Sequence, residues 1–411
     1  MRTKQRYMHA MALIVGLLVL VGAGQSQASL TIHCLNVGQG DCTLIVSPTG
    51  GTLLFDGGTN GQGSGTILPY MAGLGLTALD YVSSSHYHMD HIGGLDEVVN
   101  SIGIDSVRVA VLDRGWSYTT QTYTGYANAV AAKRTTILDQ QVIDLGGGVT
   151  VTCVTVNGNG VLSEPFLSSN HDENDMCVGL LVEYENFEFF VGGDLSGVNS
   201  SSYTNIETPT APDIGDIDVY RVDHHGSSSN SNATFLSTLD AEVAIISVGS
   251  NSYGHPTQTV LDRLVSYGSY IYQTGAGSGG TIPAGEGEVV NGHVVIEVFP
   301  GYFTVDGDFY DNGLSGVEVA GQPVSFEISP NPFFGETTFY LSGAGGRDLN
   351  LEIYDVQGRL VDMLSAMGAG RAEQALTWDG RSVAGSQVAP GIYFVRIGGA
   401  AGVAPKKLVR R

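Results

Sequence analysis

Four side chains that can bind a metal ion lie within six residues near position 90. The stretch His86-Tyr87-His88-Met89-Asp90-His91 follows an apolar segment and is followed at once by Ile92-Gly93-Gly94-Leu95. Histidine is rare here, with ten among 411 residues, so this clustering is not expected by chance. Imidazole nitrogen and carboxylate oxygen suit zinc, manganese or iron(II). We therefore interpret His86, His88, Asp90 and His91 as metal ligands rather than as polar loop residues.

Later polar residues at predicted strand ends can complete a site for two ions. Asp194 follows a strand predicted at 187–191, and its two carboxylate oxygens can bridge two metals. His224 or His225 would close the second ion's site. Because neighbouring residues of a strand point in opposite directions, we expect one of the two to bind metal and the other to face substrate. The sequence leaves open which one binds.

Four further residues are candidates for supporting roles. Asp41 and Asp56 are predicted to accept hydrogen bonds from ligand histidines, with plain turn residues as the alternative. His255, before Pro256, can donate to a leaving-group oxygen or can simply begin a helix. His171 is the only histidine between His91 and Asp194, and it is a further candidate ligand.

The first 28 residues have the pattern of a secretory signal peptide. A positive start with Arg2, Lys4 and Arg6 precedes an apolar run at 10–24, and residues 26–28 resemble a cleavage site. The run is shorter than the roughly 20 residues that span a bilayer, although a retained anchor is the alternative. No later segment is long and apolar enough, so we expect no transmembrane span after cleavage and a secreted or cell-surface location.

The remaining sequence divides into two predicted domains. Over 29–310, strands with polar residues at their ends alternate with helices, which predicts a layered α/β sandwich with its site at the sheet edge. Residues 311–322 are Gly-rich and mostly polar and are predicted as a linker. Over 323–411, strands of period two with glycine turns predict a small all-β sandwich. Among single elements we expect helices at 67–73, 95–102 and 123–134 and a final hairpin with arms at 289–298 and 303–305.

Negative charge is concentrated in the first domain. The six basic and 33 acidic residues of 29–322 give it a formal charge of −27, whereas the whole chain carries −23. Such a domain repels polyanions at long range, and non-specific nucleic-acid binding depends on Lys and Arg. The charge therefore argues against long DNA as a substrate, unless it is only a solubility or salt adaptation.

The chain has four cysteines, whose redox state the sequence leaves open. Cys34, Cys42, Cys153 and Cys177 can form disulfides after export or can remain buried free thiols. None of them has the CxxC spacing of a zinc or redox site.

The order of the motifs resembles one branch of a known fold. The HxHxDH pattern with a later Gly-Asp resembles the metallo-β-lactamase fold superfamily. The full ordered series is similar to the extracellular hydrolase domain of ComEC-type DNA-uptake (competence) proteins: 35–41, 55–58, 86–95, 193–194, 223–227 and 251–256. The resemblance covers residues 30 to about 305.

This resemblance implies an αββα sandwich that holds two divalent metal ions, zinc or else manganese. The ligands it implies are His86, His88, Asp90, His91, Asp194, His224 and His225, and the catalytic residues are Asp90, His224 and His255. Many enzymes of this fold supply another histidine midway along the chain. ComEC-like sequences have an Asn/Asp-rich stretch there instead, which Glu173-Asn174-Asp175 matches.

The C-terminal part resembles a type IX secretion sorting domain or a FlgD-like immunoglobulin-type domain. The matching residues are 329–333, 353–359, 378–380 and 391–394, with a basic end at 406–411. The resemblance implies the secretion machinery as a partner and no catalysis, and a generic adhesive β-sandwich is the alternative.

Together these features predict a secreted, dinuclear metal-dependent hydrolase. The resemblance favours a phosphodiesterase or nuclease-like activity on DNA or a phosphorylated envelope polymer, and the negative charge favours a small phosphodiester. Two alternatives remain: a lactone, thioester or β-lactam hydrolase on the same fold, and a non-catalytic, metal-stabilised surface binding module.

Overall fold

The computed structural model describes residues 29–158, 160–162, 171–299, 301–311, 325–342, 349–355, 359–366, 373–383, 385–398 and 406–411. The predicted signal peptide at 1–28 and nearly all of the predicted linker at 311–322 lie outside these residues. The chain divides into two compact units, Met1–Gly313 and Leu314–Arg411. This division falls within the segment predicted as the linker.

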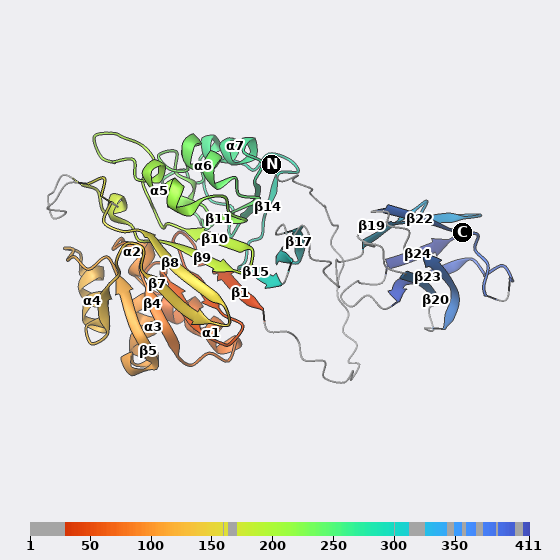
Figure 1. Cartoon of the computed structure of the whole chain (residues 1–411), viewed down its shortest axis with the longest axis horizontal. Coiled ribbons are helices and arrows are strands. Elements are labelled where there is room, and N and C mark those ends of the chain that lie inside the picture. Colours follow the sequence, from red (N-terminus) through yellow and green to blue (C-terminus); the bar gives the residue numbers. More distant parts are fainter. Residues whose placement is uncertain are drawn as a thin grey trace. The chain divides into compact units, whose positions relative to one another are not determined.

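Two β-sheets form the centre of the first unit (Figure 1). The first sheet has the order β17-β16-β15-β1-β2-β3-β4-β5-β6 and the second has the order β14-β13-β12-β11-β10-β9-β8-β7. The strands of the first sheet are β1 (Leu30–Cys34), β2 (Thr43–Val46), β3 (Thr52–Phe55), β4 (Leu79–Ser83), β5 (Val107–Asp113), β6 (Arg134–Thr136), β15 (Val294–Phe299), β16 (Tyr302–Val305) and β17 (Asp308–Asp311). Those of the second are β7 (Val142–Gly146), β8 (Val149–Thr155), β9 (Gly179–Tyr184), β10 (Phe187–Val191), β11 (Val219–Arg221), β12 (Val243–Ile246), β13 (Tyr270–Gln273) and β14 (Gly287–Val289).

Three apolar layers hold the helices and sheets together. Ile32 and Phe55 of the first sheet pack with Val151, Phe189 and Val243 of the second in one buried cluster between the sheets. A second cluster joins the outer face of the first sheet to α1 (Leu68–Gly73), α3 (Leu95–Ile102) and α4 (Gln121–Val130). A third joins the other sheet to α5 (Glu207–Ile214), α6 (Ala233–Leu239) and α7 (Gln258–Ser266). The unit is therefore an αββα sandwich, as predicted.

Parallel strands at the centre of each sheet bring the polar motifs to one edge. β3, β4 and β5 are parallel, as are β10, β11, β12 and β13. Asp56 follows β3, the histidine motif follows β4, and Asp194 follows β10. Because parallel strands end on the same side of a sheet, these side chains meet there although they are distant in the sequence.

Two local predictions differ from the structure. The helix predicted at 123–134 ends at Val130, and Arg134 instead begins β6, whose pairing with β5 extends the first sheet. The predicted final hairpin forms, because β15 pairs antiparallel with β16, but its first arm is shorter than 289–298: Val289 belongs to β14, which pairs with β13 in the other sheet. A period-two pattern does not reveal which sheet a strand joins, so the sequence did not show this crossing.

All four cysteines are buried free thiols, which agrees with the second of the two alternatives. Burial raises the pKa of Cys34 to about 11 and that of Cys153 to about 12, so both remain protonated at neutral pH. A protonated, buried thiol is a poor nucleophile and a poor metal ligand.

The second unit is an all-β sandwich, as predicted. One sheet has the order β18-β19-β22 and the other has the order β21-β20-β23-β24. Their bounds are β18 (Ser325–Ser329), β19 (Thr337–Ser342), β20 (Leu349–Asp355), β21 (Leu360–Ala366), β22 (Glu373–Trp378), β23 (Gly391–Gly398) and β24 (Lys406–Arg410). Phe326, Phe339 and Trp378 pack against Ile353 and Val395 in its core. In neither unit do the described residues include a helix of the length and apolarity that crossing a membrane requires.

Substitution Phe189→Ala is expected to lower the free energy of unfolding by about 3–5 kcal/mol, because it empties part of the layer between the sheets. Phe189 is 0% exposed there. The control Val109→Ala, on the 54% exposed Val109 of β5, is expected to cost less than about 0.5 kcal/mol. Urea denaturation followed by circular dichroism measures both, and equal losses would contradict the layered core.

Candidate metal centre

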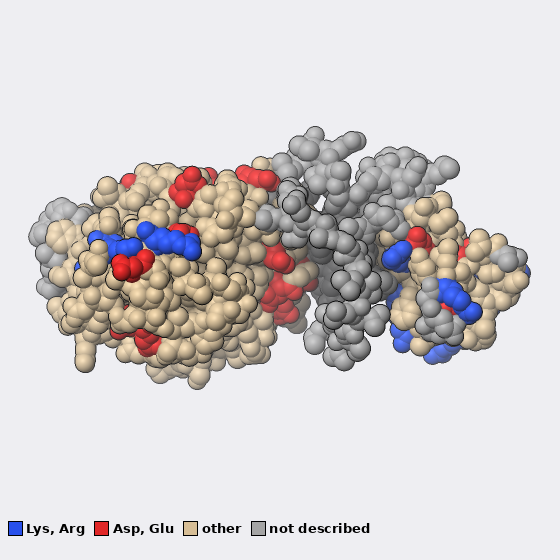
Figure 2. Space-filling view, turned by 90° about the horizontal axis from the view of Figure 1, so that it is seen from below, with Lys and Arg blue, Asp and Glu red and all other residues tan. Residues whose placement is uncertain are grey.

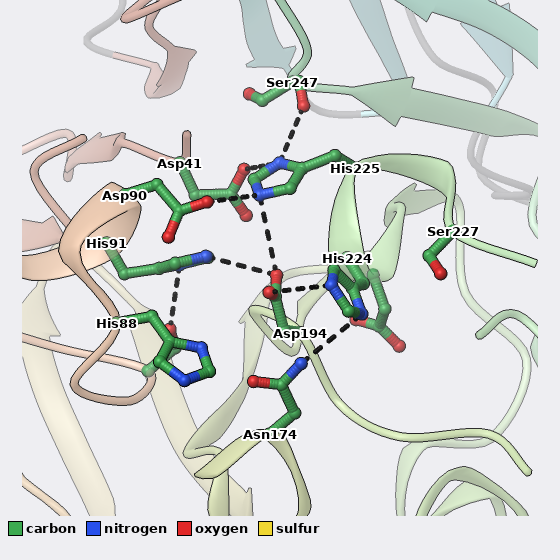
Figure 3. Close-up of polar contacts among 12 residues, drawn as sticks. Asp41, His88, Asp90, His91, Asn174, Asp194, His224, His225, Ser227 and Ser247 are labelled. Carbon is green, nitrogen blue, oxygen red and sulfur yellow. Dashed lines mark hydrogen bonds and ion pairs between the residues drawn. The ribbon is translucent and has the colours of Figure 1, made fainter. Parts of the chain in front are cut away.

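Asp194 lies at the centre of the site, with two histidines near each of its oxygens (Figure 3). Its Oδ2 is 3.8 Å from Nε2 of His86 and 3.4 Å from Nε2 of His224. Its Oδ1 is 3.2 Å from Nε2 of His91 and 3.8 Å from Nε2 of His225. The carboxylate thus divides the four imidazoles into two pairs, one on each side.

The HxHxDH motif contributes to both sides. His86 is buried in the segment that follows β4. Its Nε2 lies 3.0 Å from Nδ1 of the half-buried His88. Asp90 and His91 belong to the short helix α2 (Met89–Ile92). Asp90 Oδ2 lies 3.4 Å from Nε2 of His225, which places Asp90 on the same side of Asp194 as His91.

His224 and His225 lie in a tight turn, so both imidazoles point toward Asp194 (Figure 3). Each has φ of 53°, in the left-handed region that residues other than glycine seldom adopt. The expectation that one binds metal and the other faces substrate assumed that the two continue the strand, and the structure places both in a turn instead. Two successive left-handed residues reverse the chain within the motif, and strain of this kind is concentrated at functional sites.

Hydrogen bonds orient three imidazoles. Nδ1 of His225 is 3.0 Å from the carbonyl oxygen of Ser247, and Nδ1 of His91 is 2.8 Å from Asp56. Nδ1 of His224 is 3.1 Å from Oδ1 of Asn230, whose amide nitrogen donates to the Asp194 carbonyl at 3.2 Å, and 3.4 Å from the amide nitrogen of Asn174. The partners of His91 and His225 are acceptors, so Nδ1 of each donates and Nε2 of each faces Asp194.

The unpaired atoms of this cluster fit a divalent cation. Nε2 of His91 and of His225, Oδ1 of Asp194 and Oδ2 of Asp41 are buried and have no hydrogen-bond partner among the described residues. Nε2 of His91 and Oδ1 of Asp194 are close, but they are not aligned for a hydrogen bond. Leaving buried polar atoms unpaired is costly, whereas neutral imidazoles and carboxylates are the donors that zinc and manganese take.

Electrostatics keep Asp194 ionised. Burial raises the pKa of its carboxyl group, but the neighbouring His224, His91 and His225 outweigh burial and hold that pKa well below its usual range. Burial also raises the pKa of Asp90, but the adjacent His225 and the charge of His91 outweigh burial and hold that pKa well below its usual range. Both carboxylates are therefore anionic at neutral pH and available as ligands.

A buried ion pair between Arg221 and Asp41 supports the site. Arg221, 1% exposed, donates to Asp41 Oδ1 at 2.6 Å, and the same oxygen is 3.2 Å from Nδ1 of His225. The backbone of Asp41 donates to the Asp90 carbonyl at 3.0 Å, and a Cβ on Gly40 would lie 2.5 Å from that carbonyl oxygen. Sequence reasoning found Asp41 but missed Arg221, whose only signal is one basic residue within an apolar strand.

A second buried pair holds the backbone of the histidine motif. Arg114 donates to both oxygens of Glu173, at 2.8 and 2.6 Å, and Glu173 accepts from the backbone nitrogen of Tyr87 at 3.0 Å. The Arg114 guanidinium also lies 4.3 Å from the centre of the Tyr87 ring. Tyr87 lies between His86 and His88 in the sequence, so the Arg114–Glu173 pair holds the segment that carries both histidines. Neither role was apparent in the sequence.

His255 lies beside the cluster and His171 does not join it. The His255 ring centre is 5.5 Å from that of His224. Burial, followed by the charges of His224 and His225, lowers the pKa of His255 to about 4, so its imidazole is neutral at pH 7. Among the described residues, none of the close groups of potential ligands contains His171.

The fold and the donor set together define an αββα protein with a divalent-metal centre at the edge of its sheets. Residues 35–249, more than half of the chain, match the metallo-beta-lactamase superfamily, and the chain belongs to that superfamily. Residues 327–411 match the secretion system C-terminal sorting domain. That domain marks the chain for type IX secretion to the cell surface or the extracellular space.

The chain is also similar to three proteins of known sequence or structure. It is 27% identical to Recombination protein 2 of Haemophilus influenzae over 255 residues, and this alignment covers 61% of this chain and 28% of that protein. It is 24% identical to ComE operon protein 3 of Bacillus subtilis over 269 residues, and this alignment covers 59% of this chain and 31% of that protein. Zn(2+)-bound PqqB from Methylobacterium extorquens shares 13% identity, with 59% of this chain and 86% of that chain covered and a TM-score of 0.34. The chain thus spans less than a third of the length of Recombination protein 2 and of ComE operon protein 3.

Substitution Arg221→Met is expected to lower the free energy of unfolding by about 3–5 kcal/mol, because it leaves the buried carboxylate of Asp41 without its cation. The control is Arg108→Met. The Arg108 side chain is 57% exposed and is paired with Asp80 at 3.2 Å, so its loss is expected to cost less than about 1 kcal/mol. Urea denaturation of the two variants makes the comparison, and a small effect at Arg221 would show that the pair does not support the site.

Proposed function

We propose that residues 29–311 form a dinuclear metal-dependent phosphodiesterase, exported by the C-terminal sorting domain. The division of four histidines between the two oxygens of Asp194 carries this proposal. A carboxylate that faces two groups of imidazole nitrogens is suited to bridging two ions. The finding that the chain belongs to the metallo-beta-lactamase superfamily supports a metal-dependent hydrolase.

The ligands divide into two sets around Asp194. We assign Asp90, His91, His225 and Asp194 Oδ1 to one ion, and His86, His88, His224 and Asp194 Oδ2 to the other. In this assignment His224 takes the place of the histidine that many enzymes of this fold supply midway along the chain. The imidazole nitrogens and anionic carboxylates of both sets suit zinc, with manganese as the alternative.

When bound, such ions lower the pKa of a water molecule toward 7 and polarise a phosphoryl oxygen. The chain's own residues supply the rest. Asp56 and the Ser247 carbonyl accept hydrogen bonds from Nδ1 of His91 and His225, which orients Nε2 of each histidine toward the site. The neutral His255, beside His224, can donate a hydrogen bond to a leaving-group oxygen but does not supply an imidazolium proton at pH 7.

Two observations favour a phosphodiester over the other bonds that this fold cleaves. The matched relatives are named for recombination and competence, which points to a nucleic-acid backbone. The histidines and carboxylates of the site suit two metal ions, and a two-metal centre is suited to in-line displacement at phosphorus. We therefore propose cleavage of a nucleotide phosphodiester.

Substitutions Asp90→Ala and Asp194→Ala are each expected to lower hydrolysis of bis(4-nitrophenyl) phosphate by about 100-fold or more, since each removes a ligand of an ion whose charge stabilisation is worth several kcal/mol. Asp194→Ala is also expected to reduce the bound metal per chain, measured by elemental analysis. The control is Asp105→Ala, at an exposed aspartate outside the site, and it is expected to keep full activity.

The substrate panel separates the competing functions. A phosphodiester, a lactone, a thioester and a cephalosporin are compared after the protein is loaded with zinc or with manganese. Preference for the lactone, thioester or β-lactam would replace the phosphodiesterase. A protein that holds metal but hydrolyses none of them would be the binding module.

A further inference from the structure

The cationic side chains of the first unit are already engaged within it. Residues 29–311 contain six Lys and Arg residues, all of them described. Arg114 and Arg221 are buried in ion pairs with Glu173 and Asp41. Arg134 pairs with Asp113 at 2.6 Å, and Arg263 donates to the Ser231 carbonyl at 2.6 Å.

The remaining two cations lie away from the site. Arg108 pairs with Asp80, and Lys133 donates to the carbonyl of Val107 at the start of β5, the end opposite to the metal centre. On the face of this unit shown in Figure 2, blue atoms are confined to one small area beside acidic side chains. Described Lys and Arg residues of this unit therefore offer no uncommitted charge beside the metal centre for a phosphate backbone.

Three tyrosines flank the metal centre instead. The ring centre of Tyr118 lies 6.1 Å from that of His88. The Tyr203 ring lies 6.4 Å from His224, and the Tyr253 ring stacks on His255 at 5.7 Å with an interplanar angle of 29°. Tyr253 is 72% exposed, whereas Tyr118 and Tyr203 are half-buried. Each of these rings adjoins a histidine of the site, and Tyr118 also packs against the apolar cluster on the outer face of the first sheet; together the three form an aromatic rim.

We propose that the aromatic rim, Tyr118, Tyr203 and Tyr253, selects the substrate by stacking on unpaired nucleobases on either side of the scissile phosphodiester. This inference rests on the proposed phosphodiesterase activity and adds its substrate class, a short single strand. Every base has a π-face, so stacking is independent of sequence, and it is worth about 1–3 kcal/mol per base. Paired bases of a duplex do not offer these faces, so a duplex is excluded.

The proposal also sets the sign of the salt dependence. A nuclease that binds phosphates through Lys and Arg loses affinity steeply as salt rises, because counterions are released on binding. Here a unit with six basic and 33 acidic residues at 29–322 repels the strand, and salt screens that repulsion. Affinity is therefore expected to stay constant or to increase between about 50 and about 200 mM salt.

The experiment compares two strands of equal charge on the metal-loaded, full-length mature protein. One is a thymidylate strand of about five nucleotides, and the other has the same length but abasic sugars. Both carry phosphorothioate linkages, which keep the charge and slow hydrolysis, so fluorescence anisotropy reports Kd. The thymidylate strand is expected to bind about tenfold or more tightly than the abasic strand, in line with stacking of one to two bases.

Substitutions Tyr253→Ala and Tyr118→Ala are each expected to reduce that Kd ratio by about fivefold or more, whereas Tyr253→Phe and Tyr118→Phe, which keep the ring, retain it. Tyr253 is highly exposed, so its alanine variant keeps the fold. The matched control is Tyr340→Ala, at a 52% exposed tyrosine of the second unit, and it is expected to leave the ratio unchanged.

Equal Kd values for the two strands would overturn the proposal, and so would a ratio that survives both alanine substitutions or an affinity that falls steeply with salt. Equal binding would mean that the sugar–phosphate backbone alone is held. Cleavage of unmodified strands is measured separately. A protein that binds bases through the rim but cleaves no phosphodiester would refute the proposed function and leave the stacking inference intact.

Discussion

The buried carboxylate of Asp194 is the constraint on which the rest of the site depends. A carboxylate in the interior is tolerated only when positive or polar groups surround it, and here four imidazole Nε2 atoms lie within 3.2–3.8 Å of its oxygens. Each of three imidazoles is in turn held through Nδ1 by an acceptor from a different part of the chain. The imidazoles surround Asp194 and their acceptors hold the imidazoles, because buried polar groups need hydrogen-bond partners.

The αββα architecture makes this arrangement possible. Parallel strands in both sheets end on one side, and the polar residues follow directly after those ends. The apolar layer between the sheets fixes their separation, and the ion pair of Arg221 with Asp41 joins segments 180 residues apart. The scarcity of Lys and Arg has a second consequence, because the few present are already engaged within the unit, and two of them, Arg114 and Arg221, hold the site. Recognition outside the metal centre then depends on aromatic rings, of which the unit has several at the rim.

Much of the fold was predictable because its signals are local. The helix at 95–102 and the strands before Asp56, Asp194 and the histidine motif follow from apolar periodicity and glycine turns, and they lie where expected. The final hairpin forms, but the sequence did not show that Val289 joins the other sheet, because sheet membership depends on partners elsewhere in the chain. For the site, residue types and motif order indicated a metal centre, but Arg221, Arg114 and Asn230 carry no spacing that marks them as its support.

The sequence by itself determined the donor set, its order along the chain and the division into an acidic α/β domain and a β-sandwich. Those properties depend on side-chain chemistry and on short-range periodicity, both of which the sequence contains directly. Only the tertiary structure decided that both His224 and His225 face Asp194, because that outcome depends on two left-handed backbone conformations at successive residues. It also decided that three tyrosines from separate loops adjoin histidines of one site. Such placements depend on how distant segments pack, and no local pattern encodes that packing.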